Sequence, residues 1–180
     1  VSGPGACGRM NNEILARAKT VRLLILDSDG VLTDGRVWVG PEGQEWLAFD
    51  RRDGEGIRRV LASGITVQFV SHELCPAMLK RAQKLGVSLH LGVQDKAETI
   101  RTIMRVSSHG PLTPAEVAYM GDDEPDVEAM DLVGLAIAPA DAHPAAQLAA
   151  HWITKARGGR GAVREVCDLL ISARAGHDSG

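Results

Sequence analysis

The chain contains few aromatic residues and few cysteines. Only 3% of its 180 residues are aromatic, so the core has to be built from aliphatic side chains. The three cysteines, Cys7, Cys75 and Cys167, are odd in number and widely spaced. They indicate neither a disulfide framework nor a zinc site, and they favour a reducing, cytoplasmic setting.

An excess of positive charge and a long apolar run are also missing. The formal net charge of −3 argues against nucleic acid or an anionic membrane as a partner. No apolar run approaches the ~20 residues that span a bilayer. The N-terminal residues lack the apolar centre of a signal peptide. We expect a flexible arm over residues 1–19, one domain over residues 20–174 and a flexible tail over residues 175–180.

Within that domain, short apolar runs alternate with helical patterns. The sequence predicts strands over residues 21–26, 65–70, 89–91, 117–120, 133–138 and 151–154. It predicts helices over residues 55–62, 76–85, 96–106, 125–130, 144–149 and 162–173. This alternation is typical of an α/β fold with a central parallel sheet and helices on both faces. Such a sheet binds its ligand at the carboxyl ends of the strands.

One segment interrupts the alternation. Residues 36–39 and 44–49 flank the sequence Gly40-Pro41-Glu42-Gly43, which is a typical turn. We expect a β-hairpin here, extending over the strand ends as a flap.

The first predicted strand is followed directly by Asp27-Ser28-Asp29-Gly30. The Asp27 carboxylate can attack phosphorus, and Asp29 can protonate the leaving alcohol and later deprotonate water. Attack on a phosphate dianion requires a cation such as Mg²⁺ to offset the charge. The alternative is structural, because acidic residues often end strands and Asp-Gly is a common turn.

Three later features favour the catalytic interpretation. Ser71 ends the second predicted strand, where its hydroxyl can hold a phosphate oxygen or simply cap a helix. Lys96 begins a predicted helix, where its ammonium can neutralise phosphate or be an ordinary surface group. Asp122, Asp123 and Asp126 follow the third strand, and clustered carboxylates are costly without a cation. Their alternative role is to complement a helix N-terminus.

This order of motifs resembles the haloacid dehalogenase-like phosphohydrolases, which have a Rossmann-like fold. The resemblance implies that Asp27 is the nucleophile and that Asp29 also gives a backbone carbonyl to Mg²⁺. It implies that Asp122 is the remaining protein ligand, with Asp123 just outside the ligand sphere. The implied metal ligands are therefore Asp27, Asp29 and Asp122, and the implied catalytic residues are Asp27, Asp29, Ser71 and Lys96.

A narrower resemblance covers residues 20–173. The runs LDSDGVLTDG, FDRRDGEGI, VAYMGDDEPD, ADAHP and GGRGAVREVCDLL are similar to the subfamily without a cap domain. That group includes 3-deoxy-D-manno-octulosonate 8-phosphate phosphatases, phosphatases of nine-carbon sugar acids, and the C-terminal domain of some acylneuraminate cytidylyltransferases. Members are typically homotetramers in which the hairpins form the interface and a neighbour helps to close each active site.

The resemblance also bears on the substrate, a phosphorylated sugar acid. The octulosonate enzymes usually have Thr-Gly-Arg where this chain has Ser71-His72-Glu73, so the carboxylate-binding arginine is replaced and a bulky His72 is added. The enzymes of 2-keto-3-deoxy-nononate 9-phosphate are similar in having a glutamate here and a lysine eleven residues later, matched by Glu73 and Lys84. This favours a nine-carbon substrate, that ester or N-acylneuraminate 9-phosphate, over 3-deoxy-D-manno-octulosonate 8-phosphate.

Arginines are the candidates for binding the substrate carboxylate. Arg52 matches the arginine of the family's Arg-Asp-Gly segment, and Arg160 and Arg164 lie in the glycine-rich segment before the last helix. The alternative for Arg164 is a solvated helix face.

Three other functions remain to be weighed. A non-catalytic oligomerisation module is the first alternative, and the intact Asp27, Asp29, Lys96 and Asp122 argue against it. A receiver domain has its acidic pair before the phosphorylated aspartate and lacks the hairpin. A dinucleotide-binding domain is disfavoured because no G-x-G-x-x-G follows the first strand.

Overall fold

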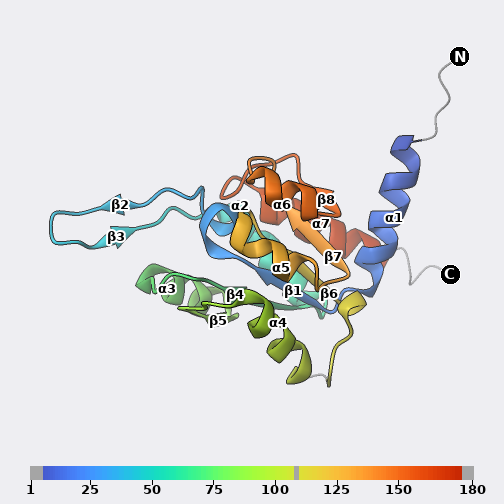
Figure 1. Ribbon diagram of the computed structural model, residues 1–180, viewed down its shortest axis with the longest axis horizontal. Helices are drawn as coiled ribbons and strands as arrows, with labels where there is room; N and C mark the ends of the chain where they lie inside the picture. Colours follow the sequence, from blue (N-terminus) through green and yellow to red (C-terminus); the bar gives the residue numbers. More distant parts are fainter. Residues whose placement is uncertain (1–5, 108–109, 176–180) are drawn as a thin grey trace, which may run out of the picture.

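The computed structural model describes residues 6–107 and 110–175, and its centre is a six-stranded parallel sheet (Figure 1). The strand order is β5-β4-β1-β6-β7-β8, and every neighbouring pair is parallel. The strands are β1 (Leu23–Leu26), β4 (Thr66–Val70), β5 (Ser88–His90), β6 (Val117–Met120), β7 (Leu135–Ala138) and β8 (Trp152–Ile153). All six predicted strands, and with them the α/β class, are confirmed.

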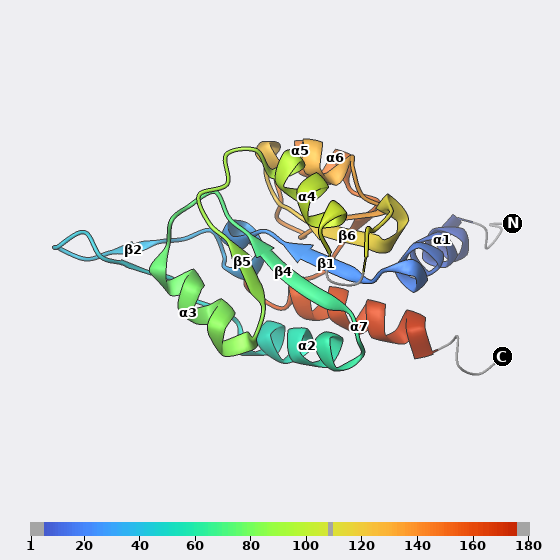
Figure 2. The same ribbon diagram turned by 90° about the horizontal axis from the view of Figure 1, so that it is seen from below.

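Helices cover both faces of this sheet, as Figure 2 shows. Helices α2, α3 and α7 lie on one face, and α4, α5 and α6 lie on the other. The helices are α1 (Ala6–Thr20), α2 (Arg51–Ala62), α3 (Pro76–Leu85), α4 (Lys96–Arg105), α5 (Val127–Met130), α6 (Pro144–Ala149) and α7 (Ala162–Ala175). Across the described residues, no helix is long and apolar enough to cross a membrane.

The core is aliphatic and consists of one layer on each side of the sheet. Side chains of β1 alternate between these layers: Leu24 and Leu26 join the layer beneath α2, α3 and α7, and Leu23 and Ile25 join the other. A strand that is buried on both faces reads as an unbroken apolar run. Burying each such side chain contributes about 1.5–3 kcal/mol, which anchors the strand that carries Asp27.

The N-terminal segment differs from expectation. We expected a flexible arm over residues 1–19, but Ala6–Thr20 forms helix α1. Ala18 is buried, Ile14 and Leu15 pack against the core layer that contains α7, and the Arg17 guanidinium donates to the Gly134 carbonyl at 2.7 Å. Packing against the rest of the fold therefore stabilises a helix that the local sequence pattern does not predict. Residues 1–5 of the expected arm and residues 176–180 of the expected tail lie outside the described residues.

The hairpin is present and projects away from the sheet (Figure 1). Strands β2 (Trp38–Val39) and β3 (Glu45–Trp46) pair antiparallel, with Trp38 opposite Trp46. Gly43 has a φ of +79°, which a glycine adopts without strain. No domain is inserted between β1 and α2, which confirms the prediction of a fold without a cap there.

A glycine-rich loop before α7 packs against the turn after β1, residues 28–32. The Gly159 amide donates to the Val31 carbonyl at 2.9 Å. A Cβ on Gly158 would lie 1.7 Å from the Gly30 carbonyl oxygen, and one on Gly159 would lie 2.4 Å from the Thr33 carbonyl carbon. Only residues without a side chain permit this approach, so the loop fixes the position of the turn.

Candidate active site

The polar residues predicted from the sequence meet at the carboxyl edge of the sheet. Asp27 follows β1, Ser71 follows β4, and Asp122 follows β6 after one intervening glycine. Asp27 and Asp122 border a cavity of about 550 Å³, whereas Ser71 is buried next to His72, which lines that cavity. Its lining residues are Asp27, Asp29, Gly30, Gly35, His72, Glu73, Gln94, Lys96, Asp122, Asp123, Pro125 and Asp126. Six of these side chains are carboxylates, which makes this acidic cavity a site for a cation.

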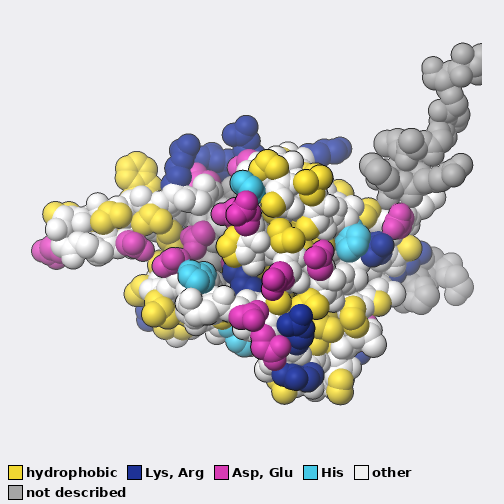
Figure 3. Space-filling view, viewed as in Figure 1, with side chains coloured by type: hydrophobic (Ala, Val, Ile, Leu, Met, Phe, Trp, Pro, Cys, Tyr) yellow, Lys and Arg dark blue, Asp and Glu magenta, His cyan; other side chains and the backbone are white. Residues whose placement is uncertain are grey.

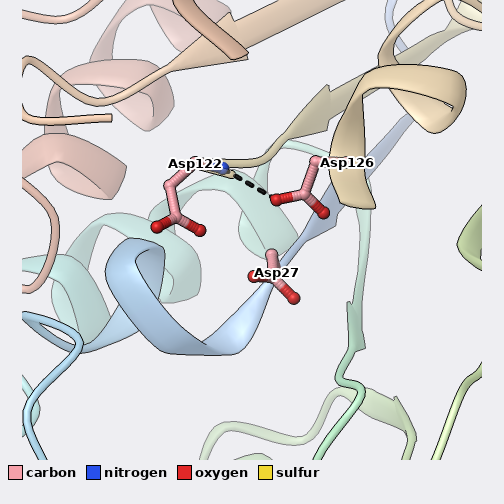
Figure 4. A group of neighbouring side chains, drawn as sticks. All are labelled: Asp27, Asp122 and Asp126. Carbon is pink, nitrogen blue, oxygen red and sulfur yellow. Dashed lines mark hydrogen bonds between the residues drawn. The ribbon is translucent and has the colours of Figure 1, made fainter. Parts of the chain in front are cut away.

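Three carboxylates converge most closely (Figure 4). Asp27, Asp122 and Asp126 each offer an oxygen within 4.8 Å of the other two. Asp126 is fully buried, and its Oδ2 accepts hydrogen bonds from the amides of Asp122 at 2.9 Å and Asp123 at 3.1 Å. Asp126 thereby fixes the loop that carries Asp122.

Lys96 is buried among these carboxylates. Its Nζ donates to Asp27 Oδ1 at 2.9 Å and to Asp126 Oδ1 at 2.5 Å. Burial acts to lower the pKa of Lys96, but the Asp27 and Asp126 carboxylates outweigh it and raise that pKa. Asp95 caps α4 by accepting the Glu98 amide at 2.8 Å, which sets Lys96 in the first turn of the helix.

Asp126 and Tyr119 were not assigned functions from the sequence. The buried Tyr119 hydroxyl donates to Asp126 Oδ1 at 2.5 Å. Asp123, which was assigned a place beside the metal, has its side chain turned to cap the Glu124 amide at 2.8 Å and is largely exposed. Asp126 joins Asp27 and Asp122 in the carboxylate group, and a place for Asp123 beside the metal stays a prediction. The acidic run after β6 signalled both residues, but spacing alone does not show which one points inward.

The crowding of acids raises their pKa values. Burial, followed by the Asp126 carboxylate, raises the pKa of Asp27 well above its usual range despite the opposing effect of Lys96. The same two causes raise the pKa of Asp122 to about 7. Burial, followed by the Glu73 carboxylate, raises the pKa of Asp29, which suits a group that has to donate a proton.

Gly30 allows the closest approach within the site. Its φ is +75°, and a Cβ there would lie 1.9 Å from Asp122 Oδ2. The turn after β1 and the Asp122 loop therefore meet with no side chain between them. Asp29 lies in this turn, at the edge of the cavity.

Ser71 provides a buried hydroxyl. Its Oγ makes no hydrogen bond with any residue that the structure describes. A buried hydroxyl usually has a partner, so this atom fits a donor to a bound anion such as phosphate.

The predicted substrate-binding residues are not all brought together. Glu73 lines the cavity, but Lys84 is exposed in the last turn of α3. Glu73 precedes the first turn of the same helix, and no ion pair joins these two described residues. Arg52 is exposed, pairs with Asp50 at 2.6 Å and donates to the Arg160 carbonyl.

Arg160 lies outside the acidic cavity. It pairs with Asp34 at 3.0 Å and borders a separate cavity of about 240 Å³. That second cavity is lined by Asp34, Arg36, Asp141, Arg157 and Arg160. Arg164 pairs with Asp168 at 2.8 Å on the face of α7, in agreement with its structural alternative.

The donor set fits a divalent cation. Carboxylate oxygens are the ligands that Mg²⁺ prefers, and several crowded carboxylates with raised pKa values gain most from its charge. Asp27 and Asp122 would hold it, while Asp126 is already engaged by Lys96, Tyr119 and two amides. A backbone contribution from Asp29 stays a prediction.

Comparisons with known proteins identify relatives of this chain. Residues 77–165 match the pattern of the haloacid dehalogenase-like hydrolases. The 3-deoxy-D-manno-octulosonate 8-phosphate phosphatase KdsC of Yersinia pestis is 41% identical over 168 residues, which cover 93% of this chain and 88% of that protein. KdsC of Escherichia coli K12 is 42% identical over the same shares.

Solved structures are similar as well. The Yersinia pestis enzyme has a TM-score of 0.87 at 40% identity, covering 93% of this chain and 90% of that one. The Moraxella catarrhalis enzyme, solved with magnesium, phosphate and a KDO molecule, has a TM-score of 0.87 at 32% identity, covering 93% and 95%.

Fold and site together define a hydrolase of phosphoric monoesters. The chain belongs to the haloacid dehalogenase-like hydrolases, in the group without a cap domain that contains the 3-deoxy-D-manno-octulosonate 8-phosphate phosphatases.

Replacing Asp126 tests the role of the buried network. We expect Asp126→Asn to lower Mg²⁺ affinity and activity ~10–100-fold, because the Lys96 contact and the geometry of the Asp122 loop both depend on this carboxylate. Asp123→Asn is the matched control and should have little effect. Calorimetric Mg²⁺ titration together with phosphate release measures both. Equal losses in the two variants would contradict the assignment.

Competition between protons and Mg²⁺ gives a second prediction. The pKa of Asp122 is about 7 in the folded protein, against an ordinary value of 3.8. At pH values between these two, Asp122 is therefore protonated in the folded state but ionised in the unfolded state. In chelator, the free energy of unfolding therefore falls as pH rises from about 4 to about 7. Mg²⁺ replaces that proton, so the rise in Tm on adding Mg²⁺ should be larger at about pH 8 than at about pH 5.5. Asp122→Asn should remove most of the difference, whereas a pH-independent rise in the parent protein would refute the competition.

Proposed function

We propose that this protein is a Mg²⁺-dependent phosphatase that hydrolyses 3-deoxy-D-manno-octulosonate 8-phosphate through an aspartyl-phosphate on Asp27. The observation that carries the proposal is the ion pair between Lys96 and Asp27 inside the acidic cavity. The buried Ser71 hydroxyl, which has no partner among the described residues, supports it. The relatives named for this ester cover 93% of the chain, and one of their structures holds magnesium, phosphate and KDO.

The reaction follows from the positions of these groups. An Asp27 oxygen attacks phosphorus, and the bond from phosphorus to the sugar oxygen breaks as Asp29 gives its proton to that oxygen. Asp29 then takes a proton from water, whose oxygen attacks phosphorus and frees phosphate and Asp27. Lys96 and Ser71 hold phosphoryl oxygens throughout, and bound Mg²⁺ supplies the charge that offsets the repulsion between carboxylate and phosphate.

The eight-carbon ester replaces the nine-carbon substrate that the sequence favoured. The relatives described above are named for the octulosonate ester, and none of these comparisons supports a nine-carbon preference. That preference depended on Glu73 and Lys84, but Glu73 lines the acidic cavity and Lys84 is absent from its described lining. The complete catalytic set argues in the same way against a non-catalytic oligomerisation module.

A second copy of the chain is part of the proposal. No arginine from the described part of the chain lines the acidic cavity, although the substrate carries a phosphate and a carboxylate. The hairpin meanwhile exposes Val37, Trp38, Val39 and Trp46, whose exposed fractions are 45%, 68%, 67% and 54% (Figure 3). Exposed aromatic side chains on a projecting element are typical of a subunit interface. We infer a homotetramer in which neighbouring copies share active sites and supply arginines such as Arg52 or Arg160. The cytoplasmic location expected from the sequence stays a prediction.

Phosphate release from three esters tests the function. With Mg²⁺, the octulosonate 8-phosphate should be hydrolysed with the highest kcat/KM, ahead of the 9-phosphates of 2-keto-3-deoxy-nononate and N-acetylneuraminate. Asp27→Asn should reduce kcat at least ~10³-fold with an unchanged circular dichroism spectrum, because the nucleophile is lost. Mg²⁺-dependent turnover that survives in Asp27→Asn would overturn the mechanism, and a higher kcat/KM for a nine-carbon ester would overturn the substrate.

A charged residue introduced on the hairpin tests the proposed tetramer. Trp38→Glu should convert the tetramer to smaller species and lower activity on the sugar acid ester, because a carboxylate would be buried in the interface. Leu148→Glu is the matched control, since Leu148 is 88% exposed on α6, far from the hairpin in the chain. Light scattering coupled to gel filtration gives the mass of each variant. A Trp38→Glu protein of parental mass would argue against the hairpin interface.

A further inference from the structure

The loop after β4 is fastened to the loop after β5 at the mouth of the acidic cavity. The Ser71 amide donates to the His90 carbonyl at 2.8 Å, and the Val93 amide donates to the Ser71 carbonyl at 3.0 Å. A side chain adds to these backbone bonds, because His72 Nδ1 lies 3.0 Å from the Val93 carbonyl oxygen. His72 is therefore held in place even though its side chain is exposed to the cavity.

This contact determines the state of the imidazole. A carbonyl oxygen can only accept a hydrogen bond, so Nδ1 has to carry the proton. In the neutral ring, Nε2 then has a free lone pair. No hydrogen bond from the described residues engages Nε2, which leaves it available to a ligand in the cavity.

Few other groups in the cavity can bind the sugar part of a substrate. Among the described residues, three lining side chains contain nitrogen: His72, Gln94 and Lys96. Lys96 is committed to Asp27 and Asp126, and Gln94 contacts the Gly92 carbonyl at 3.5 Å. The remaining polar side chains are carboxylates, which repel an anionic substrate unless they face the cation or accept from its hydroxyls.

The position of His72 suggests which part of the substrate it meets. It follows Ser71, whose buried hydroxyl has no partner among the described residues and holds a phosphoryl oxygen in the proposed reaction. Because His72 is the next residue along the chain and lines the cavity, its side chain can reach the part of the substrate next to the ester. In a sugar phosphate, the carbon chain carries a hydroxyl adjacent to the ester carbon.

We propose that His72 is a substrate-binding residue that determines specificity, with Nε2 accepting a hydrogen bond from the hydroxyl next to the phosphate ester. The inference rests on the proposed function, because it requires a phosphorylated polyhydroxy acid as substrate. The contact binds the ground state and the transition state alike, so it acts on KM and leaves kcat nearly unchanged.

Two substitutions separate the two ring nitrogens. Asparagine places its amide near Nδ1 and can keep the bond to Val93, but it has no atom at Nε2. Glutamine places its amide near Nε2. We expect His72→Asn to raise KM for the octulosonate ester about 5–10-fold, as for the loss of one hydrogen bond, and His72→Gln to restore most of that loss.

A substrate without the hydroxyl serves as the internal control. The kcat/KM for p-nitrophenyl phosphate, which has no hydroxyl beside its ester, should be unchanged in both variants. Equal losses on both substrates, or parental KM values in His72→Asn, would overturn the role of His72 while leaving the phosphatase intact. If the parental enzyme hydrolyses p-nitrophenyl phosphate but none of the sugar acid esters, the proposed substrate class is wrong, and this contact is wrong with it.

Discussion

The buried ion pairs of Lys96 are the interaction on which the active site depends. One ammonium contacts both Asp27 and Asp126, and all three groups are removed from water. Burying such charges is costly, and it is tolerated only where every group has partners of good geometry. Here the Tyr119 hydroxyl and the amides of Asp122 and Asp123 complete the set around Asp126. The network therefore contributes more to the orientation of the active-site groups than to the stability of the fold. It holds in place the nucleophile and the metal-binding loop, whose negative charges would otherwise repel each other.

The sheet makes this network possible by bringing distant segments together. Strands β1, β4 and β6 are neighbours and parallel, so the residues that follow them share one edge. Lys96 reaches the same edge from the first turn of α4, which Asp95 caps. The remaining condition is steric, and Gly30 meets it by leaving room for the Asp122 carboxylate. The fold alone therefore does not determine the chemistry, which depends on a few residues at the carboxyl edge of the sheet.

The sequence predicted the fold well because the signals were local. The bounds of β6, α3 and α6 agree to the residue, since apolar runs and N-terminal prolines mark them. The order of Asp27, Ser71 and Asp122 after strands, with Lys96 at a helix start, also predicted the edge of the sheet at which Asp27, Lys96 and Asp122 meet. Helix α1 was missed, because its stability comes from packing against a helix at the other end of the chain.

The sequence also did not predict the direction in which individual side chains point. Asp123 and Asp126 both stand in the acidic run, and only the turn geometry decides that Asp126 points inward. The pairing of Glu73 with Lys84 was inferred from spacing alone, but Lys84 lies in the last turn of the ten-residue helix α3 and Glu73 precedes the first turn. Arg52 was matched by motif, but the charge of Asp50, its near neighbour, holds it locally. Spacing identifies the members of a site more readily than it identifies their contacts.

The contact between Gly158, Gly159 and the turn after β1 has a consequence for biosynthesis. The nucleophile and its turn are among the first parts of the domain to leave the ribosome, whereas the glycines that fix this turn are among the last. Because domains fold as units during synthesis, the catalytic turn stays incomplete until nearly the whole domain has emerged. A nascent chain can therefore assemble much of the sheet while still lacking a working active site.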